Sequence, residues 1–472
     1  MPPTDATNDA VNDAANDTGS APRIGRRGWL AVLLASASYV TILDNLGLAV
    51  AFPTIEKAFP TFERTTLAWV SSGYAVALAS LLLVGGRMAD RWGRRRIYRI
   101  GMISFAVAAL CAAGAPNPWL LIAARTAQGA AGALVMASAL ALALPLIHPA
   151  RRGTAMGWLG VSGSMASLLG PLVAGNLLAV SSWRVVFCIT PPICLIAWWG
   201  APRVFDPDSP DGDATIDVVG AIEATLAVAL ATLAITQSAR LGLDNRFVLG
   251  SAAVSAVLGA AFLRRCLRVS NPLLRLGTLR RRSFSVATAS QLFTQLTIFT
   301  WFFSIPLFLQ NEWGWSPSRS GWIITVAMAM AVNSVFFGSY ADRKGYRIVL
   351  VAGGVCTSAG MVLWLLMLPP TPSWLAILPG LMVFGWGTGM VGMTSTAAAL
   401  DGIPAEELAM ANATHQTARR LMQTMGTALA VAVLGNRETA GFGRYQVVWA
   451  IVAAGYLLSG LIALGYPRRA GR

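Results

Sequence analysis

The chain has 472 residues, of which 55% are hydrophobic and only 12% are charged, and its mean hydropathy is +0.60. A soluble protein of this length needs more polar residues to cover its surface, so the composition excludes a soluble globule and indicates lipid as the solvent. The net charge of +15 does not indicate nucleic-acid binding, because the arginines lie in short loops between apolar runs.

A polar segment precedes the apolar part of the chain. Residues 1–22 are rich in Asp, Asn and Thr, and their aspartates at every fourth position would repel one another on a helix. We therefore predict a disordered cytoplasmic tail over residues 1–27. The apolar run that follows Arg27 continues to Phe52, which is longer than a secretory signal, and it predicts an uncleaved first helix.

Fourteen apolar runs are each long enough to cross a bilayer, for which a helix needs about 20 residues. The sequence therefore predicts an all-α integral membrane protein with 14 transmembrane helices. The runs cover residues 29–52, 66–86, 97–117, 119–146, 154–180, 183–201, 216–237, 246–264, 284–309, 321–340, 348–368, 374–399, 412–435 and 446–466.

The loops between these runs alternate in charge, and basic residues are concentrated in every second loop. Because cytoplasmic loops are enriched in Lys and Arg, both termini are predicted to be cytoplasmic, in a multi-pass protein of the cell membrane. The acidic stretch 203–217 lies on the same side, but acidic residues carry little weight in this rule. The basic segments are residues 23–27, 87–96, 151–152, 264–282, 343–347 and 468–472.

The sequence lacks the patterns of an enzyme or a metal site. Its five cysteines are an odd number without ligand spacing, so neither a disulfide framework nor a zinc site is expected. The sequence also contains no glycine-rich phosphate loop and no nucleophile motif. We therefore expect no enzymatic activity, no metal and no organic cofactor.

One ten-residue motif occurs twice. Residues 86–95 and residues 338–347 both fit G-x-x-A-D-R-x-G-x-R, and both follow an apolar run. A basic cytoplasmic loop would explain the arginines but not the matched Gly, Ala and Asp positions. The repeat indicates two similar helix bundles, which is how one large transporter fold is built.

This motif resembles the loop between helices 2 and 3 of the major facilitator superfamily. The resemblance implies that Asp90 holds the N-terminus of a neighbouring helix and nearby arginines, as a latch that opens during a conformational cycle. The candidate latch residues are Gly86, Asp90, Arg91, Gly93 and Arg94, with Asp342 and Arg343 in the second copy.

Eight runs, the third to the tenth, separate the two copies of the motif, whereas two plain six-helix bundles would leave six. The chain thus resembles the fourteen-helix branch, the drug:proton antiporter family 2. This implies a six-helix bundle over residues 28–202, a linker with two extra transmembrane helices over 203–283 and a second six-helix bundle over 284–472. Further matches, in the family's order, are Trp69-Val70-x-x-x-Tyr74, Asp217-x-x-Gly220, residues 271–274 and residues 309–321.

Two charged residues lie inside apolar runs at similar depth. Asp44 is about 12 Å and Arg125 about 9 Å from the outer end of its run, at 1.5 Å per residue. Because an ionised group in hydrocarbon costs about 2.5–3.5 kcal/mol, we expect both side chains to face one polar cavity. Asp44 is the candidate proton-titrating carboxylate, and Arg125 is the charge that controls or replaces its proton. A permanent ion pair that only orients two helices is the alternative.

Candidate substrate-cavity residues lie in both halves of the chain. The segments Leu43-Asp44-Asn45 and Arg125-x-x-Gln128-Gly129 resemble family motifs of helices 1 and 4. The polar and aromatic candidates of the second half are expected either to contact substrate or only to pack helices. The full set is Asn45, Trp69, Tyr74, Gln128, Gln291, Gln295, Trp301 and Asn333.

The fifth run contains small residues at spacings that let helix backbones approach closely, and Gly170-Pro171 can bend the helix. It resembles the antiporter signature of drug exporters, which favours export over uptake, although simple helix packing is the alternative. The candidate residues are Gly157, Gly170, Pro171 and Gly175.

Two further charged residues have open roles. Glu223 lies about two turns into the first extra helix, and it is either a second proton or cation site or a carboxylate that reaches the nearby loop. Arg419 resembles the arginine that precedes helix 13 in the family, and we expect it at a cytoplasmic gate or in contact with lipid.

Taken together, these features predict proton-driven export of small amphipathic drugs or antibiotics by alternating access in a monomer. Protons are the coupling ion, and the expected partners are a small-molecule substrate and the lipid bilayer, with no nucleic acid. Two alternatives are a proton-coupled uptake symporter of a small metabolite on the same fold, and a transport-inactive membrane sensor or scaffold.

Overall fold

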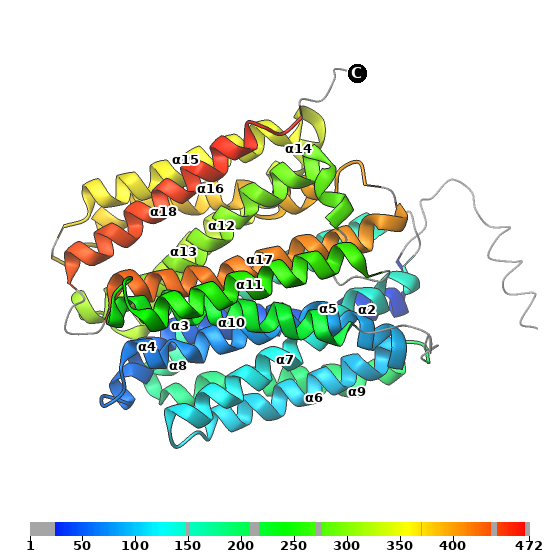
Figure 1. Ribbon diagram of the computed structural model, residues 1–472, viewed down its shortest axis with the longest axis horizontal. Helices are drawn as coiled ribbons and strands as arrows, with labels where there is room; N and C mark the ends of the chain where they lie inside the picture. Colours follow the sequence, from blue (N-terminus) through cyan, green and yellow to red (C-terminus); the bar gives the residue numbers. More distant parts are fainter. Residues whose placement is uncertain are drawn as a thin grey trace, which may run out of the picture.

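The computed structural model describes residues 24–147, 152–207, 217–269, 276–369, 371–403, 405–435 and 441–467. Within these ranges all regular structure is helical. The long helices run roughly parallel, with the N-terminal helices in the lower part of the view and the C-terminal helices in the upper part (Figure 1). The predicted all-helical membrane fold is confirmed.

The N-terminal half contains the six predicted spans. The first span is interrupted by a single 3-10 turn, η1 (Ala37–Tyr39), between α2 (Arg26–Ser36) and α3 (Val40–Ala58). The remaining helices are α4 (Arg64–Leu67), α5 (Trp69–Trp92), α6 (Arg94–Ala113), α7 (Pro118–Ala143), α8 (Arg152–Val180) and α9 (Thr190–Val204), with 3-10 turns η2 (Leu144–Leu146) and η4 (Trp183–Cys188).

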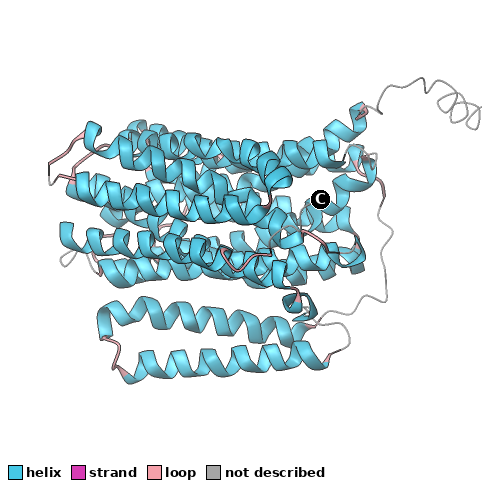
Figure 2. Ribbon diagram, turned by 90° about the horizontal axis from the view of Figure 1, so that it is seen from above, coloured by secondary structure: helices cyan, strands magenta, loops and turns pink. Residues whose placement is uncertain are grey.

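Two extra helices, α10 (Val218–Leu241) and α11 (Arg246–Arg268), form an antiparallel hairpin between the halves in sequence. Both helices begin at a capping side chain: Asp217 accepts a hydrogen bond from the Gly220 amide, and Asn245 accepts one from the Phe247 amide. Seen from above, the hairpin lies along one side of the bundle (Figure 2). Its first helix, α10, packs against α5 and α17 (Ala405–Leu434), whereas α11 packs on α10.

The C-terminal half also contains six spans. Its first helix, α12 (Arg282–Leu307), follows the 3-10 turn η5 (Leu276–Arg280) and continues into a π-helical segment at Phe308–Glu312. The next span is broken by the 3-10 turn η7 (Ala331–Asn333). The other helices of the C-terminal half are α13 (Pro317–Met330), α14 (Ser334–Lys344), α15 (Tyr346–Met367), α16 (Trp374–Leu400), α17 and α18 (Phe442–Ala463).

Twelve helical segments in the described residues are long and apolar enough to cross a membrane. They correspond to twelve of the fourteen predicted runs. The other two predicted runs are also helical: residues 321–340 form the broken pair α13 and α14, and residues 412–435 lie in α17, which carries two arginines in its middle. The structure is therefore consistent with fourteen spans, of which the broken pair consists of short helices and α17 is more polar than a simple lipid-facing helix.

The repeated motif forms the same turn in both halves. Gly93 joins α5 to α6 with φ 97° and ψ 130°, and Gly345 joins α14 to α15 with φ 95° and ψ 143°. Only glycine adopts this backbone conformation without strain, which explains the glycine at this position of both copies. We call the end of the bundle with these turns the inner end, following its predicted orientation, and the opposite end the outer end.

The halves contact one another from the outer end to the middle of the bundle. Gln310 Nε2 donates to the Val50 carbonyl at 3.0 Å, and Ser318 Oγ donates to Asn176 Oδ1 at 2.8 Å. Nearer the middle, Thr325 Oγ1 donates to the Leu168 carbonyl at 3.4 Å. These contacts hold α3 against α12 and α8 against α13, so the outer end is closed in this structure.

Candidate functional site

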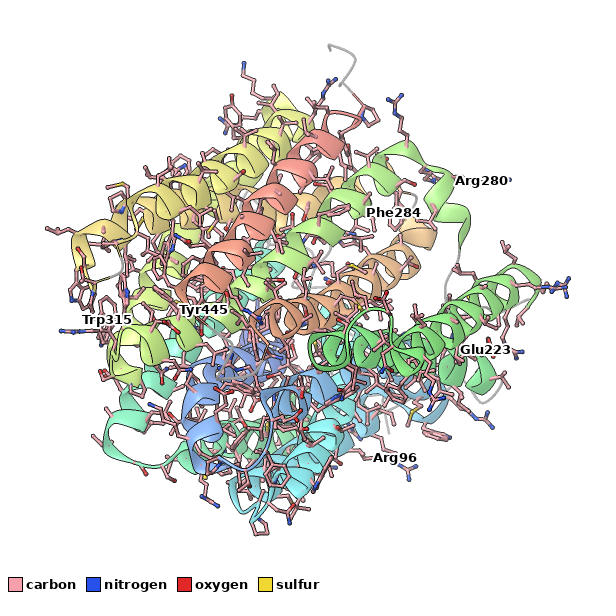
Figure 3. All side chains as sticks on the ribbon, turned by 60° about the vertical axis from the view of Figure 1, so that its left-hand side comes forward. Arg96, Glu223, Arg280, Phe284, Trp315 and Tyr445 are labelled. Atoms are coloured by element: carbon pink, nitrogen blue, oxygen red, sulfur yellow. The ribbon has the colours of Figure 1, made fainter. Side chains whose placement is uncertain are left out.

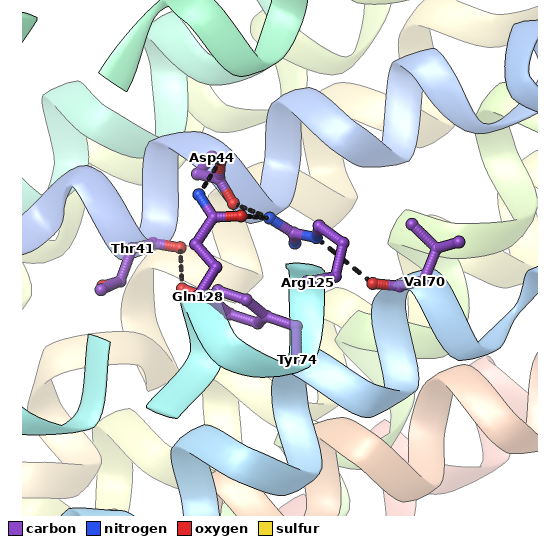
Figure 4. A network of polar contacts seen from close by, with 6 residues as sticks. All are labelled: Thr41, Asp44, Val70, Tyr74, Arg125 and Gln128. Carbon is purple, nitrogen blue, oxygen red and sulfur yellow. Dashed lines mark hydrogen bonds and ion pairs between the residues drawn. The ribbon is translucent and has the colours of Figure 1, made fainter. Parts of the chain in front are cut away.

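A carboxylate on α3 and a guanidinium on α7 meet inside the N-terminal half (Figure 4). Arg125 Nη1 donates to Asp44 Oδ2, and the two side chains are 0% and 1% exposed. Arg125 Nε also donates to the Val70 carbonyl on α5 at 3.3 Å. The two residues, which were predicted to face one polar cavity, form a direct and fully buried ion pair, so their pairing alone also fits the alternative of a permanent ion pair.

Two predicted cavity residues complete this network. Gln128 Oε1 accepts from Arg125 Nη1 at 2.6 Å, and Gln128 Nε2 donates to Asp44 Oδ1 at 3.0 Å. The Tyr74 ring lies beneath the guanidinium, 4.3 Å from Cζ to the ring centroid, and its hydroxyl donates to the Thr41 carbonyl at 3.2 Å. Three helices, α3, α5 and α7, thus hold one charged pair and its polar neighbours.

A glycine explains how the helices come close enough to build this site. A Cβ at Gly129 would lie 2.2 Å from the Tyr74 carbonyl oxygen, so only glycine allows α7 to approach α5 here. Gly129 directly follows Gln128 in the motif that was recognised in the sequence. The motif therefore combines the groups that bind the carboxylate with the residue that permits the helix approach.

The arrangement makes the charge of Asp44 decisive for local stability. With Asp44 ionised, the pair is neutral and both carboxylate oxygens accept a hydrogen bond. Protonation would leave Arg125 as an uncompensated buried cation, which typically costs several kcal/mol. Arg125 Nη2 is already buried without a hydrogen-bond partner among the described atoms. A proton on Asp44 therefore favours a conformation in which Arg125 finds another partner or water.

Two other predicted residues of this half lie outside the network. Asn45 and Trp69 are partly buried on α3 and α5. None of the hydrogen bonds described for the chain involves their side chains. Their assignment to a substrate cavity stays a prediction.

The candidates of the C-terminal half are dispersed. Gln295 Oε1 accepts from Gln423 Nε2 at 2.7 Å, and Asn333 Nδ2 donates to the Trp386 carbonyl at 3.0 Å. Gln291 is fully buried, and both of its amide atoms lack a described partner. Trp301 is fully buried against Phe384, with ring centroids 4.8 Å apart, which matches the helix-packing alternative.

The latch residues lie at the inner end. Arg94 donates to Asp90 Oδ1 through Nε at 3.2 Å and through Nη2 at 3.0 Å. The two side chains are 47% and 41% exposed. The aspartate therefore holds an arginine on the first turn of α6, across the Gly93 turn. Gly86, also in the first copy, has open space around it. In the second copy Arg343 is exposed, and the Asp342 side chain lies outside the described atoms.

The predicted antiporter helix, α8, runs unbroken from Arg152 to Val180. It packs on α3 of its own half and on α13 of the other half. A Cβ at Gly170 would lie 2.8 Å from the Leu43 carbonyl, and one at Gly175 would lie 2.8 Å from the Pro317 carbonyl. The Pro171 carbonyl in turn lies 2.4 Å from where a Cβ of Gly321 would be. Gly157 belongs to α8, but its surroundings lie outside the described atoms. Gly170 therefore allows α8 to approach α3 within its own half, whereas Gly175 and Gly321 allow α8 and α13 to touch across the halves.

Glu223 lies on α10, in the hairpin beside the bundle (Figure 3). Its side chain is half-buried, and Oε2 is buried without a described hydrogen-bond partner. None of its described contacts joins it to Asp44 or Arg125. A role for Glu223 in proton coupling therefore stays a prediction, at a place separate from the Asp44 network.

One functional candidate at the outer end was missed in the sequence. Arg64 Nε donates to Glu56 Oε1 at 2.7 Å, and each side chain is 1% exposed. Arg64 Nη1 also donates to the Gly435 carbonyl, at the end of α17, at 3.4 Å. The sequence contained one indication of this pair: two opposite charges flank the first loop, just beyond the ends of the predicted apolar runs. Together with Tyr445, they line a cavity of about 270 Å³.

Curated proteins similar to this chain are named for drug or antibiotic resistance. The puromycin resistance protein pur8 of Streptomyces alboniger is 29% identical over 426 residues, which cover 89% of this chain and 83% of that protein. The multidrug efflux pump LfrA of Mycolicibacterium smegmatis is 30% identical over 418 residues, covering 87% and 82%. The probable actinorhodin transporter of Streptomyces coelicolor is 29% identical over 444 residues, covering 90% and 76%.

The fold is also similar to a solved transporter. The crystal structure of the peptide transporter POT in complex with sulfate superposes with a TM-score of 0.68, covering 93% of this chain and 94% of that one, at 13% sequence identity. A family model described as Major Facilitator Superfamily matches residues 29–278 and 287–471. The chain therefore belongs to the major facilitator superfamily of membrane transporters.

Proposed function

We propose that this protein exports amphipathic drugs or antibiotics in exchange for protons, with Asp44 as the group that carries the proton. The observation that carries this proposal is the buried network of Asp44, Arg125 and Gln128. The names of the similar proteins support drug export.

Proton exchange would act through the helix contacts of this network. Protonated Asp44 no longer compensates Arg125, so the guanidinium relies on the Val70 carbonyl, Gln128 and the Tyr74 ring. These three groups lie on α5 and α7, whereas Asp44 lies on α3. Protonation therefore weakens the attachment of α3 to the other two helices, and α3 is also the helix that contacts α12 across the halves.

The rest of the proposed transport cycle is alternating access of the two halves. The closed outer end corresponds to a state that opens to the cytoplasm, and α8 crossing α13 provides the surface about which the halves move. We further propose that a monomer in the cell membrane carries out this cycle, with both termini in the cytoplasm. Protons are the coupling ion, and no cofactor or enzymatic step is involved.

The test uses purified protein in proteoliposomes with an imposed pH gradient and a panel of fluorescent drugs and puromycin. Wild-type protein should move at least one compound against its gradient, in the direction opposite to the proton flow. Asp44→Asn should lose this coupled transport. Asp244→Asn, in the exposed loop of the hairpin, makes the same chemical change and should retain it.

Two outcomes would contradict the proposal. Gradient-driven transport by Asp44→Asn at the wild-type rate would remove Asp44 from the coupling mechanism. Movement of the compound in the same direction as the protons would replace export with uptake. A melting temperature within a few degrees of wild type confirms that the variant is folded, so that a loss of transport reflects the missing carboxylate.

A further inference from the structure

The middle of α17 carries two adjacent arginines, Arg419 and Arg420, within the predicted thirteenth span. Both side chains are half-buried. Arg420 Nη1 donates to Gln423 Oε1 at 3.0 Å, and Nη2 contacts Met136 Sδ of the N-terminal half at 3.4 Å. Since α17 crosses the bundle, the two charges lie between the halves. Arg419 was expected at a cytoplasmic gate or in contact with lipid, and its described hydrogen bonds go to protein side chains.

Neither guanidinium has an acidic partner in the described parts of the chain. Arg419 Nη1 donates to Thr396 Oγ1 at 3.3 Å and to Gln416 Oε1 at 3.1 Å, while its Nε is buried without a partner. The ion pairs between described side chains include neither arginine. The interior therefore contains two positive charges that no acidic side chain of the described residues neutralises.

The arginine pair lies close to the proposed proton site. Met136 Sδ, which Arg420 contacts, also accepts from Thr41 Oγ1 at 3.6 Å. The Thr41 carbonyl accepts from the Tyr74 hydroxyl, and the Tyr74 ring lies beneath Arg125. Arg420 of one half is thus connected, through two intervening side chains, to the Asp44 network of the other half.

The unused N–H donors of Arg419 and Arg420 fit an anionic ligand. Each guanidinium has five N–H donors, and the contacts described use only a few of them, one on a sulfur atom that is a weak acceptor. An uncompensated cation inside a membrane protein is costly unless a ligand or water neutralises it. Carboxylates are the acceptors that match the planar donor geometry of arginine best.

We infer that Arg419 and Arg420 form the anion-binding part of the substrate site, so that the preferred substrates carry a carboxylate or another acidic group on an apolar body. This inference rests on the proposed export function. The acidic group binds the guanidiniums, and the apolar body contacts Met136 and Tyr39 of the other half, where the flexible methionine accommodates different shapes.

The test compares two dyes that share a xanthene ring system but have opposite charge: fluorescein, which is an anion at pH 7.5, and rhodamine 6G, which is a cation. Wild-type proteoliposomes should transport fluorescein more efficiently than rhodamine 6G. Arg420→Gln should lower kcat/KM for fluorescein by about tenfold or more, as expected for a lost charge-assisted hydrogen bond, and should not lower it for rhodamine 6G. Arg420→Lys should retain most fluorescein transport because the charge remains.

Three further comparisons separate the effect of Arg420 on substrate preference from a general charge effect and from lipid binding. Arg319→Gln removes one positive charge at the outer end of α13, beside Trp315, and should leave the preference between the dyes unchanged. Wild-type protein alone gives a second measurement: naphthalene-2-carboxylate should inhibit fluorescein transport at concentrations at which naphthalene-2-carboxamide does not. Liposomes made only of neutral lipid should give the same result as liposomes with phosphatidylglycerol, which shows that the anion bound is the substrate.

The outcomes distinguish failure of the inference from failure of the proposed function. Transport of rhodamine 6G without fluorescein would overturn the inference and leave export standing. Equal inhibition by the acid and the amide, or an Arg420→Gln variant with unchanged fluorescein kinetics, would overturn it as well. A requirement for phosphatidylglycerol would assign the arginines to a lipid headgroup. Proton-independent leakage of every compound would instead contradict the export function itself.

Discussion

Arg64 binds Glu56 within the N-terminal half and the carbonyl of Gly435 at the end of α17 in the other half. Both charged side chains are buried, and the ends of α3, α4 and α17 meet at this point. Because the same guanidinium belongs to an ion pair and to a contact between the halves, the outer end cannot open without releasing one of its bonds.

Replacing Arg64 with Gln should shift the protein toward a state that is open at the outer end. The variant loses the bond between the charged guanidinium and the Gly435 carbonyl of the other half, and such a bond contributes about 1.5–3 kcal/mol, so the closed state loses part of its advantage. Spin labels at Pro116 and Leu375, both exposed near the outer end, should report a longer distance in this variant. Arg184→Gln is the control, because Arg184 bonds the Ala115 carbonyl of its own half. An unchanged distance distribution would exclude a gating role.

Replacing Gln128 with Leu should slow proton-driven transport about tenfold or more while the protein stays folded. Gln128 bonds to both Arg125 and Asp44, so its loss leaves one guanidinium N–H and one carboxylate oxygen without their partner, and the two charges are no longer held in place. Initial rates of proton-driven transport, together with the melting temperature in detergent, measure the effect. Gln237→Leu on α10 is the matched control. Wild-type transport by Gln128→Leu would mean that Gln128 is not part of the coupling site.

Replacing Gly321 with Ala should separate α8 from α13. The new Cβ would lie 2.4 Å from the Pro171 carbonyl oxygen, which belongs to backbone that cannot rotate away. We expect a loss of about 1–3 kcal/mol of stability, as for other overpacked cores, and slower transport. Thermal unfolding in detergent and dye efflux check both effects. Gly250→Ala on α11, where the added Cβ has open space, should behave like wild type.

Replacing Asp90 with Asn separates the latch role from simple stability. The Asp90 and Arg94 side chains are exposed, and such pairs contribute only about 0.3–0.5 kcal/mol, so the melting temperature should hardly change. If the pair controls the conformational cycle, the transport rate should nevertheless fall severalfold. Asp206→Asn is the control, because Asp206 forms an exposed pair with Arg27 outside the repeated motif. Equal small effects of both changes would argue against a latch.

Much of the architecture could be predicted because membrane helices follow composition. Runs of about 20 apolar residues located the helices, and two buried charges at matching depth pointed to the pair of Asp44 and Arg125. Helix ends were less accurate: the first span continues to Ala58 rather than Phe52, since Glu56 and Lys57 extend the helix although they end the apolar run. The 3-10 break at Ala331–Asn333 also left no clear pattern in the sequence.

The contacts between the halves could not be read from the sequence. The series of small residues around Gly175 showed that close helix approach was possible, but its partner, Gly321, depends on how two distant segments fold against each other. Likewise, Arg420 lies in an ordinary polar stretch of α17, and only its contact with Met136 places it between the halves. Composition identifies the charges, whereas their neighbours come from tertiary packing.

The hairpin adds a constraint that a plain pair of six-helix bundles does not have. Its helix α10 packs against α5 of one half and α17 of the other, while α11 packs on α10. Whenever the halves move apart, α10 can stay with only one of them, so a crevice must open along its other side. Lipid tails are the material available to fill that crevice, and the thickness and fluidity of the surrounding bilayer will therefore affect how fast the molecule changes shape.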